Sequence, residues 1–328
     1  MENIKKLVKK LYKINYIENI KKIGGFSSDN FVINDKFLLK IIKNKTQGYL
    51  EHLIENYLLL NEFKLPLAMP VINIEDKYYS KVNENFIILF PYFKNSKVLH
   101  EANLEDLHYN QIAYELTKFH KIPTENINSI KRRELFSLNN FNKERIRTIN
   151  YIENNPIDNQ THDLTIKLIE EKEKMLSDIN LNSINNIITN SNDLVHGDFH
   201  NENILFDLND KILCFLDFEE MHIGNKMEDV INFILFACCN SGFKEINLKK
   251  SKIFINHYNE CNSITKNDMD FGLEYAILRL VSSFFLENKL YESKDLFFTK
   301  LLERDLNKIK YFKENKQIFL NNINNNLK

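Results

Sequence analysis

The segment from His196 to Glu219 restricts the fold of this chain more than any other. It contains Asp198, then Asn203 five positions later, and Asp217 fourteen positions after the asparagine. Two apolar runs, 204–206 and 212–216, flank a turn that is rich in Asp and Asn. Apolar runs joined by such residues are typical of a β-hairpin. The pattern therefore predicts a loop followed by two paired strands, the second of which ends at Asp217.

The predicted hairpin carries Asn203 and Asp217 to one edge of the fold, beside Asp198. Oxygen ligands of this kind suit Mg²⁺, which binds few protein ligands and takes the others from phosphate and water. In phosphoryl-transfer enzymes an Asp orients the attacking hydroxyl, and an Asn and a second Asp hold Mg²⁺ on the nucleotide phosphates. A loop rich in Asp and Asn can also be a plain turn. The complete string with its two strands favours the chemical interpretation.

Two histidines in the same segment raise the alternative of a zinc site. Gly197 lies between His196 and His200, and the helical His-Glu-x-x-His context of zinc enzymes is absent. We therefore expect His196 to pack against the loop. For His200 the sequence leaves two roles open, a substrate contact and a surface position.

With these residues the chain resembles the aminoglycoside phosphotransferase and choline kinase family, small-molecule kinases that share the protein-kinase fold. Gly197 stands where protein kinases carry the Arg of their catalytic loop, and Glu219 stands where they carry the Gly of Asp-Phe-Gly. The resemblance implies a bilobal α+β fold. A small N-terminal lobe with an antiparallel sheet, residues 1–93, would bind the nucleotide. A larger, mainly helical C-terminal lobe, residues 94–328, would carry catalysis and the acceptor site.

The resemblance also implies an ATP-dependent enzyme that uses Mg²⁺, with GTP as an alternative donor, and a small molecule whose hydroxyl accepts the phosphoryl group. Asp198 would be the catalytic residue, and Asn203 and Asp217 the metal ligands. Because pseudokinases commonly lose one of these residues or the phosphate-binding lysine, their joint presence favours an active enzyme. A catalytically silent nucleotide-binding scaffold is one alternative, and a protein-kinase-like enzyme is a third option.

Further nucleotide contacts are expected in the N-terminal lobe. Gly25 and Ser27 lie in a turn before two strand-like runs, where they would approach the phosphates. Lys40 follows an apolar run and is either an exposed strand residue or the family's phosphate-binding lysine. In the second case a carboxylate of the next helix would hold it. Glu51 and Glu55 both qualify, and Glu55 is preferred.

The strongest strand pattern of the first third is 86–90, which leads into Pro91. In the family this position is the hinge between the lobes, where backbone groups bind adenine. Pro91 has no N–H to donate, so only its carbonyl could accept from the adenine amino group. Phe93 would supply the N–H donor.

Hydrophobic periodicity predicts the remaining elements. Three short strands are expected within 18–43. Helices are expected over 2–13, 49–63, 105–120, 226–240, 247–260, 265–290 and 292–318, with several more in 132–190 broken near Pro156. The resemblance gives His120 and Asp229 structural roles, the latter as a brace of the catalytic loop.

The composition of the chain limits the classes of binding partner that it can have. The chain has 328 residues with 44 Lys and Arg against 45 Asp and Glu, so no basic excess indicates nucleic acid or an anionic membrane. The four cysteines show no paired or metal-ligand spacing, and neither a signal peptide nor a membrane span is evident. We therefore expect reduced cysteines in a cytoplasmic protein.

The acceptor is the least determined part. Glu219, Glu220 and Glu228 follow the metal-binding Asp and could form an acidic rim that attracts an ammonium group. An amino sugar, an aminoglycoside or an amino alcohol such as choline would fit that rim. Arg279 could instead pair with a carboxylate, as in a homoserine-type substrate, and a methylthioribose-type substrate also stays open. His200 is the remaining candidate for an acceptor contact.

Overall fold

The computed structural model describes residues 1–24, 28–125, 127, 130–240, 242–324 and 327. The chain divides into two units. The first contains Met1–Leu99, a short segment that ends at Lys131, and Glu202–Met221. The second contains His100–Glu125, Arg132–Asn201 and His222–Lys328. The expected lobe boundary after residue 93 stays a prediction.

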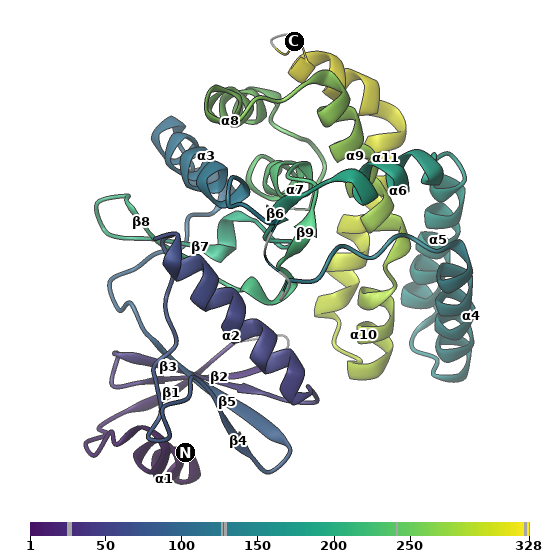
Figure 1. Ribbon diagram of the computed structural model, residues 1–328. Coiled ribbons are helices and arrows are strands. Elements are labelled where there is room, and N and C mark those ends of the chain that lie inside the picture. Colours follow the sequence, from purple (N-terminus) through teal and green to yellow (C-terminus); the bar gives the residue numbers. More distant parts are fainter. Residues whose placement is uncertain (25–27, 126, 128–129, 241, 325–326, 328) are drawn as a thin grey trace. The chain divides into compact units, whose positions relative to one another are not determined.

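The first unit is built on a five-stranded antiparallel sheet with the strand order β1-β2-β3-β5-β4 (Figure 1). Its strands are β1 (Ile20–Ile23), β2 (Ser28–Ile33), β3 (Phe37–Ile42), β4 (Ser80–Val82) and β5 (Asn85–Pro91), and its helices are α1 (Glu2–Tyr12) and α2 (Gln47–Glu62). These bounds confirm the helix expected at 2–13 and the three strands expected within 18–43.

The turn between β2 and β3 follows from its residues. Asn34 and Asp35 both have a positive φ, 52° and 51°, and the Lys36 N–H donates to the Ile33 carbonyl at 3.0 Å. Asn and Asp tolerate this left-handed region, which hairpin turns with the right-handed twist of strands require. The turn sets the register of β3, in which Lys40 lies opposite Asn30 of β2.

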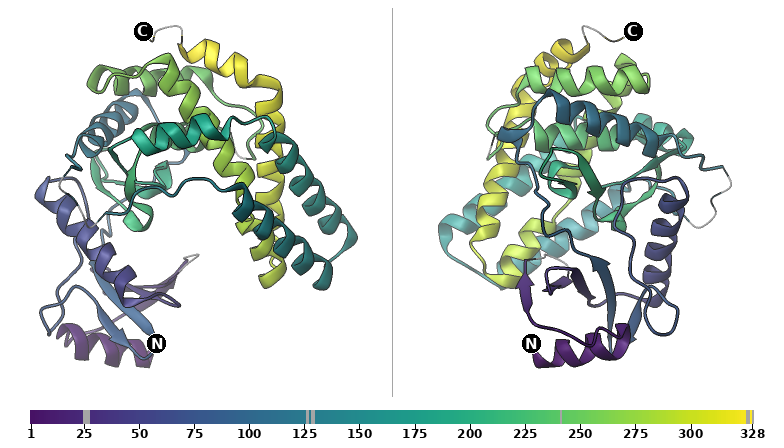
Figure 2. Two further views of the ribbon diagram at one scale, coloured as in Figure 1. Left: turned by 45° about the vertical axis from the view of Figure 1, so that its right-hand side comes forward. Right: turned by 90° about the vertical axis from the view of Figure 1, so that its left-hand side faces the viewer.

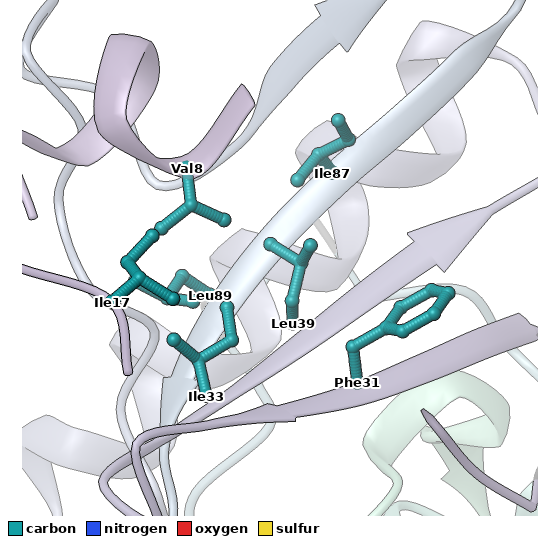
Figure 3. Close-up of a cluster of buried hydrophobic side chains, with 7 residues drawn as sticks. All are labelled: Val8, Ile17, Phe31, Ile33, Leu39, Ile87 and Leu89. Carbon is teal, nitrogen blue, oxygen red and sulfur yellow. The ribbon is translucent and has the colours of Figure 1, made fainter. Parts of the chain in front are cut away.

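Side chains of a strand alternate between its two faces. Figure 3 shows one face, on which Val8 of α1 packs with Ile33, Leu39 and Leu89. Lys40 follows Leu39 directly and therefore points to the opposite face. The apolar layer under α1 thus fixes the face on which the lysine is presented.

We expect Leu39→Ala to lower the free energy of unfolding by about 2–5 kcal/mol, because a fully buried leucine is lost and a cavity is left. Leu39 has 0% exposure. Denaturant titration measures the change. Leu58→Ala on α2 is the control, since Leu58 is 37% exposed and such changes stay within about 0.5 kcal/mol. Equal losses in the two variants would contradict the assignment of this core.

The hairpin predicted after Asn203 is confirmed, and it belongs to the first unit. Strands β7 (Ile204–Phe206) and β8 (Ile212–Phe215) pair antiparallel. The Leu216 N–H donates to the Asn203 carbonyl at 2.9 Å, which closes the open end of the hairpin. The Phe215 N–H donates to the Pro66 carbonyl at 2.7 Å, which ties β8 to the chain after α2.

The second unit is mainly helical. Its helices are α3 (Asp106–His120), α4 (Leu138–Asn154), α5 (Asn159–Leu176), α6 (Leu181–Asn190), α7 (Met227–Ala237), α8 (Leu248–Cys261), α9 (Lys266–Ser282), α10 (Phe285–Ser293) and α11 (Phe297–Asn324). Two short strands, β6 (Asp193–Val195) and β9 (His222–Gly224), pair antiparallel. The long helix α11 packs along α5, α9 and α10 (Figure 2). Together the two units confirm the expected α+β, protein-kinase-like fold.

One expected helix is wrong. The single helix predicted over 265–290 is two helices, α9 and α10, because Ser283 adopts an extended conformation. The buried Lys172 of α5 donates at 2.5 Å both to the Ser283 carbonyl and to Glu287 of α10. A buried ammonium group thus satisfies the carbonyl that the break releases, which periodicity alone could not indicate.

No helix in the described part of the chain has both the length and the apolar character needed to cross a membrane. All four cysteines are free, and Cys214, Cys238 and Cys239 are buried.

Candidate active site

The first unit contains a cavity of about 530 Å³ on the face of the sheet that carries Lys40. Five of the predicted nucleotide and metal residues line it, from three separate parts of the sequence. They are Lys40, Pro91, Phe93, Asn203 and Asp217. Apolar side chains such as Leu38, Phe90 and Leu205 form other parts of the wall. The cavity therefore combines an apolar surface with a few polar groups, which is typical of a small-molecule site.

Lys40 lies between two carboxylates. Its Nζ is 3.3 Å from Asp217 Oδ1 and also pairs with Glu219 Oε1, and its side chain is 17% exposed. Burial opposes the charged amine, but Asp217 and Glu219 outweigh it, so the pKa of Lys40 is raised. The amine therefore stays protonated and can contact phosphate.

Glu219 belongs to the single turn η3 (Phe218–Glu220), directly after Asp217. Burial favours its neutral form, but the pairing with Lys40 prevails and the pKa of Glu219 is lowered. Its Oε2 accepts a hydrogen bond from the hydroxyl of Tyr49 on α2. Burial and this carboxylate raise the pKa of Tyr49, which keeps the phenol protonated as the donor. A chain of contacts thus links β3, the Asp217 loop and α2.

The expected pairing of Lys40 with Glu55 is corrected. Among the described residues, the ion-pair partners of Lys40 are Asp217 and Glu219, and Glu55 is exposed on α2. The helix turns Asn56 and Tyr57 inward, and these side chains contact Phe218. Since residues next to each other on a helix point in different directions, Glu55 faces away. A contact of Glu55 with the nucleotide that does not involve Lys40 is not tested by these ion pairs.

We expect Lys40→Ala to weaken nucleotide binding by about 10–150-fold, because a hydrogen bond to a charged group contributes roughly 1.5–3 kcal/mol. Glu55→Gln should leave binding unchanged, because the exposed carboxylate does not hold the lysine. Calorimetric titration with nucleotide measures both variants. Comparable losses in the two variants would restore Glu55 as the partner.

Asp217 adopts a left-handed backbone conformation, with φ 63° and ψ 64°. This conformation is costly for most L-residues; Asp tolerates it better than most, and contacts with the surroundings help to hold it. Support comes from α2: Asn56 Nδ2 donates to the Phe218 carbonyl at 3.2 Å, and the rings of Tyr57 and Phe218 meet edge to face at 5.4 Å. The helix therefore holds the loop in the conformation that presents Asp217 to the cavity.

The segment after β5 offers backbone groups to the cavity. Pro91 has no N–H, and the Tyr92 N–H donates to the Lys36 carbonyl at 2.8 Å. The Phe93 carbonyl accepts from Ser96 at 3.1 Å for the backbone N–H and 2.7 Å for the hydroxyl. Within the described residues, no hydrogen bond from the Phe93 N–H is found. A contact of this N–H with a nucleotide base stays a prediction.

Asn203 and Asp217 offer one amide oxygen and one carboxylate group at the cavity. In the part of the chain that the structure describes, no group of three or more His, Cys, Asp or Glu residues could hold a metal ion. His196 and His200 belong to no such group among the described residues. The donor set fits Mg²⁺, which is commonly held by one or two carboxylates plus substrate phosphates.

Asp198 lies in the second unit, in a loop that a buried carboxylate organises. Asp229 of α7 accepts from the backbone N–H groups of His196 at 2.7 Å and Gly197 at 2.9 Å. Its Oδ2 lies 3.0 Å from Nε2 of His120, and Asp229 has 0% exposure. Burial raises the energy of this carboxylate, but the hydrogen bond from His120 prevails and the pKa of Asp229 is lowered. The structural roles expected for Asp229 and His120 are confirmed.

Asp198 itself is held at its backbone and its side chain. Its N–H donates to Nδ1 of His196 at 3.3 Å, and Oδ2 lies 3.5 Å from Nε2 of His200. Burial opposes ionisation, but the contact with His200 and the charges of His196 and Arg279 outweigh it, so the pKa of Asp198 is lowered. Its side chain is 44% exposed. The carboxylate is therefore ionised near neutral pH and accessible to an acceptor.

The expected acidic rim is not formed as predicted. Glu228 is buried, with its carboxylate 3.2 Å from Nε2 of His222 and 3.9 Å from Nε of Arg133. Glu219 is occupied by Lys40 and Tyr49. Of the three glutamates only Glu220 is exposed. A carboxylate that is buried and paired attracts a ligand cation weakly, which the sequence spacing could not reveal.

Arg279 and His200 both contact the catalytic loop. Nη1 of Arg279 donates to the Gly197 carbonyl at 3.0 Å, so this arginine braces the catalytic loop. The side chain of His200 is 12% exposed and faces Asp198. Direct contacts of either residue with an acceptor stay predictions. Gly25 and Ser27 lie outside the described residues.

The sequence analysis did not identify three residues of α2 that support the Asp217 loop, namely Tyr49, Asn56 and Tyr57. Asn56 and Tyr57 are buried on α2, and Tyr49 is half-buried two turns earlier, at positions that the helical period places on one side. A buried Asn on that side was the available signal, because a buried amide requires a partner. The partner, the Phe218 carbonyl, lies 162 positions away in the sequence, so the residue could be flagged but its role could not be assigned.

Solved structures share the fold of this chain. Spectinomycin phosphotransferase APH(9)-Ia, solved with ADP and spectinomycin, aligns with a TM-score of 0.62 at 18% identity over 95% of this chain and 93% of its own. Wild-type aminoglycoside 2'-phosphotransferase-IIIa, solved with GDP, aligns with a TM-score of 0.59 at 15% identity over 95% and 99%. A choline/ethanolamine kinase family protein from Mesorhizobium loti aligns with a TM-score of 0.61 at 9% identity over 98% of both chains. A search of curated protein sequences finds no match.

The fold and the site residues define a small-molecule kinase built on a protein-kinase-like scaffold. Residues 19–245, well over half of the chain, match the phosphotransferase enzyme family. The chain therefore belongs to that family, and the resemblance derived from the sequence is confirmed.

Proposed function

We propose that this enzyme transfers the γ-phosphoryl group of ATP to a hydroxyl group of a small, amine-bearing molecule, with Mg²⁺. The observation that carries the proposal is the cavity in which Lys40, Asn203 and Asp217 meet beside an apolar wall and the Phe93 N–H. These groups match three parts of a metal-bound nucleotide. Lys40 suits the phosphates, Asn203 and Asp217 suit the metal ion, and the apolar wall with the Phe93 N–H suits the base.

The base would lie against the apolar wall. Its amino group would donate to the Pro91 carbonyl, and the Phe93 N–H would donate to a ring nitrogen. Adenine offers this pair of groups. Guanine carries a carbonyl in place of the amino group, and Pro91 has no N–H to serve it. The arrangement therefore supports ATP, although three of the similar structures were solved with GDP.

Lys40 would contact the phosphates, and Asn203 and Asp217 would hold Mg²⁺. When bound, the metal ion offsets the negative charge that develops on the phosphoryl group. Asp198, ionised at neutral pH, would accept a hydrogen bond from the acceptor hydroxyl and orient its oxygen for attack. As the bond between the acceptor oxygen and the γ-phosphorus forms, the proton of the hydroxyl would pass to the carboxylate. The bond between the γ-phosphorus and the bridging oxygen would break, and ADP would leave with the electron pair of that bond.

Two observations support an amine-bearing acceptor. The relatives include an aminoglycoside phosphotransferase and a choline/ethanolamine kinase family protein. In this chain Glu220 is exposed just after the metal-binding Asp217. An exposed carboxylate can attract an ammonium group, and Mg²⁺ would offset the nucleotide charge. Such attraction decreases with salt, because the Debye length falls from about 10 Å at 0.1 M to about 3 Å at 1 M.

The test is an acceptor screen with the full chain, ATP and Mg²⁺. Aminoglycosides and amino alcohols are compared with neutral sugars and hydroxy acids at two ionic strengths, and phosphorylated product is detected by mass. We expect amine-bearing acceptors to be preferred and KM to rise with salt for them alone. Neutral acceptors are the internal control. A preference for an anionic acceptor would reject the amine, and no transfer to any acceptor would reject the kinase proposal.

A further inference from the structure

His200 is a polar residue beside Asp198 to which the proposed reaction gives no role. Its Nε2 lies 3.5 Å from Asp198 Oδ2. The histidine side chain is 12% exposed, against 44% for the aspartate. The imidazole is thus largely covered, while the carboxylate that it contacts is open to an acceptor.

The imidazole plane is fixed by an aromatic neighbour. The rings of His200 and Phe236 stack, with centroids 4.8 Å apart and planes inclined by 21°. Phe236 lies on α7, the helix that also carries Asp229. The Asp229 carboxylate holds the loop backbone at His196 and Gly197. One helix therefore supports both the backbone of the catalytic loop and the ring that faces the catalytic side chain.

Phe236 is in turn held from α11. The guanidinium of Arg304 and Nζ of Lys308 lie 5.6 Å and 5.4 Å from its ring centre. Lys308 Nζ is 3.3 Å from Asp305, and both side chains are 12% exposed. Cations over an aromatic face stabilise its position. The ring is thus fixed by groups on α7 and α11 rather than by the catalytic loop itself.

We propose that His200 is a positioning residue that acts through Asp198, holding the carboxylate in the orientation that receives the acceptor hydroxyl, and that Phe236 fixes the imidazole for this task. The inference rests on the proposed function. Its physical basis is that displacing a reacting group by about 1 Å can cost about 10²-fold in rate. The charged groups that act on Asp198 are His200, His196 and Arg279. His196 and Arg279 contact the loop backbone, and Nε2 of His200 lies 3.5 Å from Asp198 Oδ2.

Three variants test the proposal in the full chain. His200→Ala should lower kcat by about 10–100-fold with little change in KM for ATP. His200→Gln should recover most of the loss, because its amide nitrogen reaches the same oxygen. Phe236→Leu should give an intermediate kcat. His257→Ala is the matched control: it removes a histidine that lies 2.9 Å from Asp106 in the same unit, and kcat should not change. A loss in His200→Ala that His200→Gln does not reverse would overturn the proposal.

A double variant separates positioning from a general structural effect. If His200 acts through Asp198, adding His200→Ala to Asp198→Asn should lower kcat no further, because groups that act as a unit are not additive. Losses that multiply would overturn the inference. Carboxyl NMR titration of Asp198 gives a readout that needs no activity: His200→Ala should raise its pKa. That shift would stand even if no acceptor were phosphorylated, and its absence would count against the contact.

Discussion

Asp198→Asn is expected to lower the turnover number by about 10²–10⁴-fold, the contribution usual for a positioned acid–base group. The amide keeps the size of the side chain but cannot take the hydroxyl proton as the oxygen–phosphorus bond forms. Nucleotide binding should be nearly unchanged, because Asp198 is not among the residues that line the cavity. Steady-state kinetics and calorimetry measure the two properties separately.

The pH dependence of turnover follows from the lowered pKa of Asp198. The ionised carboxylate is the active form, so activity should persist through neutral pH. It should decrease only as the pH falls below the ordinary range of aspartate. Asp163→Asn is the control, since Asp163 is an exposed residue of α5. Turnover of the Asp198→Asn enzyme at the parent rate would remove this residue from the mechanism.

Asp217→Ala is expected to reduce turnover by about 10³-fold, because a metal ion supplies several kcal/mol of charge stabilisation in the transition state. The variant removes the carboxylate from the cavity and also one of the two partners of Lys40. ATP binding should lose most of its dependence on Mg²⁺. Calorimetric titration of ATP with and without Mg²⁺, on parent and variant, measures that dependence directly.

Asn203→Ala separates the metal effect from the effect on Lys40. Asn203 lines the same cavity, and the Lys40 partners are carboxylates elsewhere. Its neutral amide offsets less charge, so the loss of Mg²⁺ dependence should have the same direction and be smaller than in Asp217→Ala. Were both variants to bind Mg·ATP as the parent does, the two metal assignments would be wrong.

Much of the fold and of the candidate site can be predicted from patterns among residues that are close together in the sequence. The 204–216 hairpin was predicted because two short apolar runs enclose a turn of Asp and Asn residues, and this relation is contained within a few residues. The spacing of Asp198, Asn203 and Asp217 identified the family for the same reason. Lys40 was recognised by an amine among apolar neighbours, which is costly when buried without a partner.

Partners distant in sequence were beyond such reasoning. Glu219 lies 179 positions from Lys40, and only the tertiary fold places it closer than the helix carboxylate at Glu55. The burial of Glu228 could not be predicted either, because the sequence around an acidic residue does not show whether its carboxylate faces solvent or, as here, His222. Sequence spacing therefore indicates the candidate catalytic and metal-binding residues, whereas the ion pairs that shift their pKa values depend on tertiary packing.

The left-handed conformation of Asp217 has a consequence for laboratory evolution. At such a position glycine avoids the steric penalty of a Cβ atom, which amounts to roughly 1–2 kcal/mol for most L-residues and is borne better by aspartate. A library selected only for heat resistance should therefore accumulate glycine at 217, whereas one selected for turnover should retain aspartate. At position 217 thermal stability thus favours glycine, whereas catalysis requires aspartate. Variants selected for heat resistance should therefore be sequenced at this position before their activity is assumed.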